Sequence, residues 1–495
     1  MELQFPKNTV SGLKPVLQQI QNLEQTQELR IPEGMPEAAH VLACWGQAVL
    51  RGKEWNRDTL SASGGVMVWV LYAPENGSAP RRIETWVPFQ TQWDLPPDSG
   101  EGSARMMALL RFADARTVTP GKLMLRVGLG ILAEGWVPAQ WAVYEPQASE
   151  NLELLRRSYP LRLLREAGEK AFTQEETLTL PGSAPQPEAI LYYRLTPEIT
   201  DKKVLGGRLV FRGLGNLHLL YTSEEGQIHS WDFELPFSQF ADLEGAASSD
   251  AQADIQLMPT NAELELDAEG KLHLRWAATA QYLLDDRQMV EIAEDAYSPG
   301  RELEIRRETV TVPVLLDSRR EMVCPETPVP ENMGILADAC FLPDFPRQRR
   351  QGDSASLELP GVWQLLYYTD EGKLASSVQR WEGQHTLKAD GSDSLSALPR
   401  QGGRLQTGQG SLVRCEVPLR LTASVGQGLP MITAVTAGAE KQPSPGRPSL
   451  ILRRAEGTSL WELAKASGCA MDAIRSANGL EGDPAPGQLL LIPVP

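Results

Sequence analysis

The sequence predicts a mainly β protein, with three repeated β-sandwich-like domains followed by a small C-terminal domain of order strand-helix-helix-strand. Segments such as VMVWVLY and VWQLLYY are rich in β-branched and aromatic residues and run into turns that contain glycine. Such segments recur at intervals of nearly 150 residues. Helical periodicity is absent over most of each copy, whereas capped helix signals occur near the end of the chain.

The first landmark of the repeat is a strand that ends in a turn glycine. The stretches VLYAPENG, LLYTSEEG and LLYYTDEG end at Gly77, Gly226 and Gly372, with spacings of 149 and 146 residues. A second strand follows each turn, so each copy contains a β-hairpin.

Two further landmarks follow in the same order. GKLMLR begins at Gly121 and GKLHLR at Gly270, 149 residues apart, and a weaker GSLVRC begins at Gly410. The third landmark is VPF at 87–89 and LPF at 235–237, which the third copy lacks. We therefore predict three homologous domains, of which the third is the most diverged.

Helical patterns lie before and between these β segments. Residues 13–27 are predicted to form an N-terminal helix, and residues 151–171 two short amphipathic pieces that break before Pro160. Pro, Gly and Ser dominate residues 438–449, which predicts an extended and mobile linker.

These signals predict seven segments along the chain. They are an N-terminal helical segment at 1–31, β domain 1 at 32–147, a helical connector at 148–173, β domain 2 at 174–316, the diverged β domain 3 at 317–437, the linker at 438–449 and a C-terminal domain at 450–495.

The C-terminal segment begins with a short apolar strand. Ser459 and Glu462 then have the spacing of a capping box, and Gly468 ends the first helix. A second helix runs from Met471 to Ala477, and LLLIP near the end of the chain forms the closing strand.

This C-terminal segment closely resembles the LysM domain. The matching positions are Gly457, Thr458, Ser459, Leu460, Leu463, Ala464, Asn478 and the closing run from Pro486 to Pro493. Thr458 stands where the family usually has an acidic residue. LysM domains typically bind N-acetylglucosamine polymers with the loop before helix one and the loop after helix two.

By that resemblance, the binding groove or docking surface would include two short runs and one aromatic residue. They are Gly457, Thr458, Ser459 and Leu460; Asn478, Gly479, Leu480 and Glu481; and Trp461. The alternative is that these residues only cap helices and turn the chain. Trp461 is either a core residue or an anchor for a partner, and we favour the partner surface because the domain core is small.

The repeats are similar to SPOCS domains, on the segments ending in VLY, the stretch LLREAGEKAFTQEE and the stretch LAEGWVP. Several SPOCS copies followed by one LysM domain is the layout of the SipL-like spore-coat morphogenetic proteins of the Clostridia. The resemblance implies a non-enzymatic scaffold in the mother-cell cytoplasm, at the outer forespore surface. Its implied partners are the coat basement-layer ATPase and other coat proteins.

Composition excludes some other functions. Of 495 residues, 47 are Lys or Arg and 64 are Asp or Glu, and the resulting net charge of −17 disfavours nucleic-acid binding. Five cysteines without a CxxC spacing favour reduced thiols in a cytosolic compartment. We expect neither a signal peptide nor a transmembrane segment.

The sequence carries little sign of catalysis or metal binding. If the second-copy hairpin turns at Ser223-Glu224, His218 and His229 face each other, with His273 in the same copy. Three imidazoles could hold zinc, but we prefer an accidental cross-strand pair because the other copies lack counterparts.

Gly128-Leu129-Gly130 lacks the rest of a dinucleotide fingerprint, and no G-x-S-x-G, H-E-x-x-H or P-loop occurs. We predict no enzymatic activity, no metal and no cofactor. The alternative function is a protein that binds peptidoglycan or N-acetylglucosamine glycan in the cell wall or cortex.

Overall fold

The structure, a computed structural model, describes residues 2–245, 247–351, 354–388, 392, 394–399, 404–407, 412–442 and 448–493. The chain is mainly β, as predicted, and both helices of the described residues lie near its C-terminus. Neither helix has the length or apolar character needed to cross a membrane.

The first β unit contains two three-stranded antiparallel sheets. One sheet has the order β3 (Ala38–Asn56), β4 (Thr59–Pro74), β5 (Arg81–Asp94), and the other has the order β2 (Lys7–Arg30), β7 (Lys122–Tyr144), β6 (Ser103–Thr119). Val66 and Leu123, one from each sheet, are fully buried in the same apolar cluster. The two sheets therefore share one hydrophobic core.

The second β unit repeats this arrangement. Its sheets have the orders β9 (Pro187–Leu205), β10 (Arg208–Ser223), β11 (Ile228–Asp242) and β8 (Glu153–Leu178), β13 (Leu272–Tyr297), β12 (Gln252–Leu266). Leu219 and Leu274 belong to its shared core.

The third β unit is more irregular. One sheet contains β16 (Met333–Pro343), β17 (Arg347–Gln351), β18 (Ser354–Thr369) and β19 (Leu374–Lys388). In the other, β22 (Leu412–Glu440) pairs with β14 (Arg301–Val323), β15 (Glu326–Pro328), β20 (Ser394–Pro399), β21 (Arg404–Thr407) and the N-terminal β1 (Glu2–Gln4). Trp363 and Val417 are buried in the cluster between these sheets.

The turn glycines of the repeat occupy equivalent positions. Gly77, Gly226 and Gly372 follow β4, β10 and β18, the middle strands of their sheets. Their φ angles are 72°, 76° and 74°, a left-handed conformation that glycine adopts without a Cβ clash. The glycine of the weaker third GSLVRC landmark lies outside the described residues.

The predicted N-terminal helix and helical connector are wrong. Residues 13–27 lie in β2 and residues 151–171 lie almost entirely in β8, and each is an edge strand beside the long strand that closes its unit, β7 or β13. Their apolar spacing resembles a helix, but pairing along more than 20 residues outweighs that local preference. Pro15 and Pro160 are tolerated because an edge strand pairs along only one side of its backbone, so an N–H on the other side is not needed for a hydrogen bond within the sheet.

The strands also cross the predicted segment limits. β2 is hydrogen-bonded to β7, so the proposed N-terminal segment shares a sheet with the residues of β domain 1. β14 continues across the limit at residues 316 and 317. Within the predicted linker, residues 438–440 belong to β22, whereas 443–447 lie outside the described residues.

Aromatic and amide contacts join the first unit to the second. Trp45 of β3 stacks on Tyr192 of β9, with ring centroids 5.0 Å apart and planes at 10°. The Gln47 side chain makes two hydrogen bonds to the backbone of Leu195: its amide donates to the carbonyl at 2.9 Å, and its oxygen accepts from the N–H at 3.2 Å. These contacts are buried, so the two units form a continuous body.

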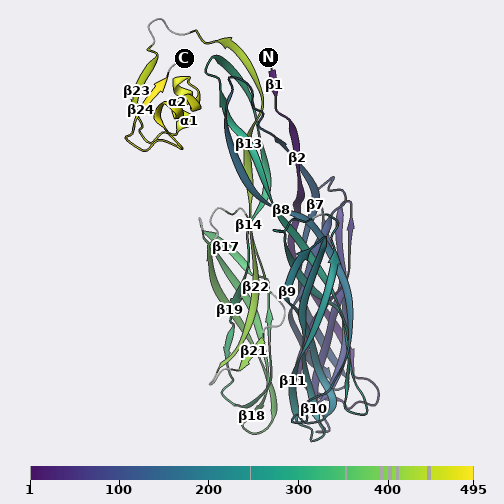
Figure 1. The fold of residues 1–495 in the computed structure, drawn as a ribbon. Helices are drawn as coiled ribbons and strands as arrows, with labels where there is room; N and C mark the ends of the chain where they lie inside the picture. Colours follow the sequence, from purple (N-terminus) through teal and green to yellow (C-terminus); the bar gives the residue numbers. More distant parts are fainter. Residues whose placement is uncertain are drawn as a thin grey trace.

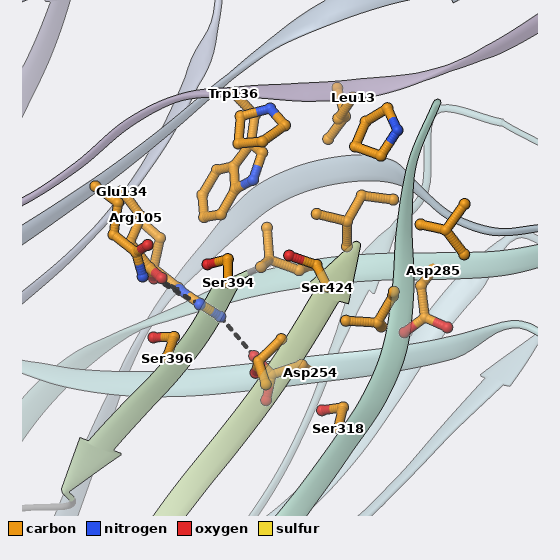
Figure 2. A pocket seen from close by; sticks show the side chains of 18 of the residues that line it. Leu13, Arg105, Glu134, Trp136, Asp254, Asp285, Ser318, Ser394, Ser396 and Ser424 are labelled. Atoms are coloured by element: carbon orange, nitrogen blue, oxygen red, sulfur yellow. Dashed lines mark hydrogen bonds and ion pairs between the residues drawn. The ribbon is translucent and has the colours of Figure 1, made fainter. Parts of the chain in front are cut away.

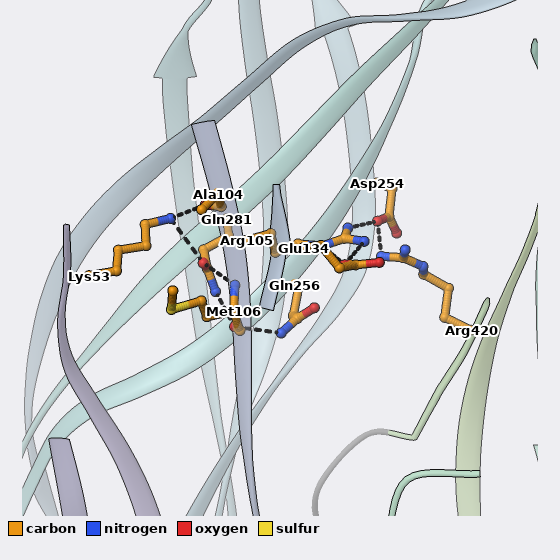
Figure 3. A network of polar contacts seen from close by, with 9 residues as sticks. All are labelled: Lys53, Ala104, Arg105, Met106, Glu134, Asp254, Gln256, Gln281 and Arg420. Carbon is orange, nitrogen blue, oxygen red and sulfur yellow. Dashed lines mark hydrogen bonds and ion pairs between the residues drawn. The ribbon is translucent and has the colours of Figure 1, made fainter. Parts of the chain in front are cut away.

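A buried polar network connects all three units (Figure 3). Arg105 of β6 makes ion pairs with Glu134 at 2.6 Å and with Asp254 of β12 at 2.5 Å. Arg420 of β22 pairs with the same Asp254 oxygen. Burial would raise the pKa of Asp254, but the guanidinium groups of Arg420 and Arg105 hold that pKa at about 2.

A buried histidine links the second unit to the third. His218 on β10 contacts Asp232 through Nδ1 at 2.7 Å and Asp338 of β16 through Nε2 at 2.9 Å. The predicted pairing with His229 is wrong, because the turn is longer: His218 lies opposite Asp232, and His229 lies opposite Tyr221. No group of three His, Cys, Asp or Glu side chains arranged for a metal ion occurs in the described ranges.

The long strands of the three units continue together past the main body (Figure 1). Their apolar cluster combines Val10 and Val143 of the first unit with Leu161 of the second and Val312 and Leu429 of the third, all nearly inaccessible. This extension leads to the C-terminal module, which consists of β23 (Leu450–Arg454), α1 (Leu460–Ser467), α2 (Met471–Asn478) and β24 (Leu489–Pro493).

Candidate functional site

The loop before α1 is organised by a capping box. The backbone N–H of Glu462 donates to Ser459 Oγ at 3.3 Å, and the N–H of Ser459 donates to Glu462 Oε2 at 3.0 Å. These bonds satisfy backbone N–H groups that have no hydrogen-bond acceptor within the helix. The helix ends at Gly468, whose φ of 64° is left-handed.

The two predicted loops of the groove lie side by side. The backbone N–H of Leu460, at the start of α1, donates to Asp483 Oδ1 in the loop after α2 at 2.8 Å. Gly457 and Gly479 have φ angles of 79° and 62°, so each loop turns at a glycine. Asp483 was not predicted, because a contact across 23 residues has no local sequence signal.

The Asn478 side chain holds α2 against β24. Its Nδ2 donates to the carbonyls of Ile474 at 2.8 Å and Leu491 at 2.6 Å. Its Oδ1 accepts from the Leu491 N–H at 2.7 Å. The amide is thus fully engaged within the module, and its role here is to position the second loop.

The nine predicted site residues differ in accessibility. Gly457, Gly479 and Glu481 are exposed; Thr458, Ser459, Asn478 and Leu480 are half-buried; Leu460 and Trp461 are buried. Thr458 Oγ1 is inaccessible and has no hydrogen-bond partner among the described residues. Thr458 directly follows the Gly457 turn, and a buried hydroxyl without a partner is unusual in a native protein.

Trp461 faces the second β unit. Its ring packs edge-on against Tyr297 of β13 at a centroid distance of 4.9 Å, and its Nε1 donates to Asp295 Oδ2 at 3.2 Å. Tyr297 in turn donates to the carbonyl of Cys469 at 2.8 Å. The exposed fraction of Trp461 is 7%, so the residue packs against a strand of the same chain in this structure and does not present the accessible partner surface favoured from the sequence.

Charge complementarity reinforces this contact. Lys465 of α1 pairs with Asp295, and Arg307 of β14 pairs with the other oxygen of that carboxylate at 2.8 Å. Burial would raise the pKa of Asp295, but the hydrogen bonds from Lys465 and Trp461 lower it. Asp295 and Tyr297 were not predicted, because they lie more than 160 residues before the helix they contact.

The opposite face of the module is apolar and exposed. Leu452 pairs with Leu491 between β23 and β24, and their exposed fractions are 60% and 36%. Leu450 and Leu489 on the same two strands are also exposed, whereas Leu490 and Ile492 point into the core. Strand alternation therefore places four leucines on one outer face, which is typical of a contact surface.

Comparison with known protein families gives a match over one part of the chain. The family described as SipL, SPOCS domain, matches residues 186–267. This segment covers β9 to β12 of the second unit and ends before β13. No curated protein and no solved structure matches the chain.

Proposed function

We propose that this chain is a non-enzymatic scaffold of the endospore coat, with three SPOCS-like β-sandwich domains and a C-terminal LysM domain. The SPOCS match over residues 186–267 carries the proposal, because that family suggests a sporulation-related protein. The recurrence of the same sheet order in the first unit extends the argument beyond the matched segment. The strand-helix-helix-strand order of residues 450–493 supports a LysM domain.

The arrangement suits a scaffold that holds several partners at once. The three units pack into one body, and the extension of their long strands places the C-terminal module at its far end (Figure 1). Several contacts on one rigid chain raise the effective concentration of each partner for the next. The proposed partners are the coat basement-layer ATPase and other coat proteins, at the outer forespore surface in the mother-cell cytoplasm.

Within the C-terminal module, the outer leucine face is the better protein-docking surface. The face that carries Trp461 is covered by Tyr297 and Asp295. The leucine face is accessible. Leu452 and Leu491 are 60% and 36% exposed, and completing their burial contributes roughly 1–3 kcal/mol to an interface. Arg454 is exposed on β23, opposite Leu489, and its charge beside the leucine face favours an acidic partner.

The test is capture of the basement-layer ATPase by the full chain. Leu452→Asp should reduce capture at least tenfold while leaving the fold intact, because the side chain is exposed. Val378→Asp is the matched control, since Val378 is 68% exposed on β19 of the third unit. Unchanged capture by Leu452→Asp would contradict the docking role of this face.

Localisation tests the class of function independently. A fluorescent fusion of the full chain should encircle the forespore in sporulating cells. A uniform cytoplasmic signal throughout sporulation would contradict a coat role.

A glycan-binding function is the second candidate. The orphaned Thr458 hydroxyl belongs to the loop before α1, two residues before the Leu460 N–H that contacts Asp483 of the second loop, and a saccharide hydroxyl or amide that reached it would satisfy it. Titration of the full chain with chitin oligomers should then show saturable binding that Thr458→Val weakens about tenfold. Ser467→Val, at the far end of α1, is the control. Absence of binding at millimolar oligomer would leave only the protein-docking role.

A further inference from the structure

A cavity of about 360 Å³ lies where strands of all three β units converge. It is lined by β2, β6 and β7 of the first unit, β8, β12 and β13 of the second, and β14, β20 and β22 of the third. Its volume lies within the range of roughly 300–1,000 Å³ that small-molecule sites occupy. It is separate from the C-terminal module and plays no part in the function proposed above.

One wall of the cavity is apolar. Figure 2 shows Leu13 and Trp136 on one side, and Pro313, Val314 and Leu315 of β14 contribute further apolar surface. This wall carries no group that needs a hydrogen bond, apart from the indole N–H. It suits the hydrocarbon part of a ligand.

The other side of the cavity carries charge and hydroxyl groups (Figure 2). Both carboxylates of the Arg105 network are already engaged: Glu134 by Arg105, and Asp254 by Arg105 and Arg420. The third lining carboxylate, Asp285, pairs with Arg162 at 2.5 Å, so each carboxylate that lines the cavity has a cation partner and a cationic ligand is disfavoured.

Two hydrogen-bonding atoms at this side have no partner. Arg420 donates to Asp254 through one terminal nitrogen, but its Nε is buried and unpartnered among the described residues. Thr422 Oγ1, two residues along the same strand, is also buried without a partner in that part of the chain. Buried donors of this kind are rare in native proteins unless a ligand or water completes them.

We propose that this cavity binds a small organic monocarboxylate with an apolar body. The carboxylate accepts hydrogen bonds from Arg420 Nε and from the Thr422 hydroxyl, and the apolar body lies against Trp136 and the β14 wall. The Nε–H of Arg420 and the hydroxyl of Thr422 are two donors, one for each oxygen of a carboxylate. Because the lining strands come from three units, the bound ligand tightens their packing.

The electrostatics of Arg420 agree with an anionic ligand. Burial, and next the like charge of Arg105, lower the pKa of Arg420 despite its contact with Asp254. Arg105 pairs with both Glu134 and Asp254, whereas Arg420 pairs with Asp254 alone and shares its oxygen with Arg105. A ligand carboxylate supplies a further counter-charge next to Arg420.

The experiment uses decanoate as the probe and the full chain as the protein. Calorimetric titration should show saturable binding of one decanoate per chain, and the unfolding temperature should rise with decanoate. Decanol, which has the same chain without the carboxylate, should bind at least tenfold more weakly. No saturable binding below the micellar concentration of decanoate, or equal binding of decanol, would overturn the proposal.

Two kinds of variant separate the site from non-specific binding. Ser424→Phe fills the cavity from β22 and should abolish binding, whereas Ser238→Phe on an exposed part of β11 should bind as the parent does. Arg420→Lys keeps a cation beside Asp254 but removes Nε, and Thr422→Val removes the hydroxyl; each should reduce the preference for decanoate over decanol about tenfold.

Circular dichroism identifies variants that fail to fold. If Arg420→Lys does not fold, Thr422→Val tests the same predicted loss of preference for decanoate. Equal decanoate affinity in Ser424→Phe and Ser238→Phe would refute the assignment of this cavity.

Discussion

His218 makes the packing of the second unit on the third dependent on pH. Burial alone would lower the pKa of this imidazole, but the carboxylates of Asp338 and Asp232 outweigh burial and raise the pKa from 6.5 to about 9. The imidazolium is therefore the native form at neutral pH. His218→Gln removes the titrating group while keeping a side chain that can donate to Asp338.

The size of the effect follows from the change in pKa. A rise from 6.5 to about 9 corresponds to about 3 kcal/mol in favour of the folded chain, at about 1.4 kcal/mol for each pKa unit. Because the folded pKa is the higher one, this stabilisation is fully present below pH 6.5. It declines as the pH rises from 6.5 to about 9 and is absent above that value.

Urea unfolding of the full chain between pH 6 and pH 10 measures this directly. The difference in unfolding free energy between the parent and His218→Gln should fall by about 3 kcal/mol across the window. His229→Gln is the matched control, because His229 lies on the adjacent strand opposite Tyr221. Parallel pH profiles for the parent and His218→Gln would refute the reasoning.

Four substitutions test other contacts. Trp461→Ala should cost about 3–5 kcal/mol of module stability and increase hydrogen exchange around Tyr297; unchanged exchange would show that the module is not seated there. Ser459→Ala should cost about 1 kcal/mol by loss of the capping box, seen as a lower melting temperature of the module. Asn478→Ala removes three hydrogen bonds and should cost about 2–3 kcal/mol in the same assay, so a loss as small as that of Ser459→Ala would contradict its clamping role. Asp254→Ala leaves two buried guanidinium groups without their shared carboxylate and should cost about 3–5 kcal/mol in urea unfolding; a cost below 1 kcal/mol would show that the network is not buried in solution.

Some features are predictable because their signals are local. The turns at Gly77, Gly226 and Gly372 depend on the glycine and its immediate neighbours, so the sequence alone is enough to predict these three turns and their spacing. The capping box of Ser459 and Glu462 spans four residues and is predictable for the same reason. Alternation and β-branched composition likewise identify the chain as mainly β.

Other features depend on residues far apart in the sequence. The apolar spacing of residues 13–27 resembles a helix, and only the pairing with β7 makes this segment a strand. A small shift of the β10–β11 turn places Asp232, rather than His229, opposite His218.

The sequence by itself determined the mainly β character, the recurring turn glycines and the capped C-terminal helices, because each has a signal within a few neighbouring residues. Only the tertiary structure decided that Trp461 packs on Tyr297 and that three units enclose a cavity beside Arg420. Those features require elements more than 100 residues apart in the sequence to meet, and no local propensity specifies which elements do so.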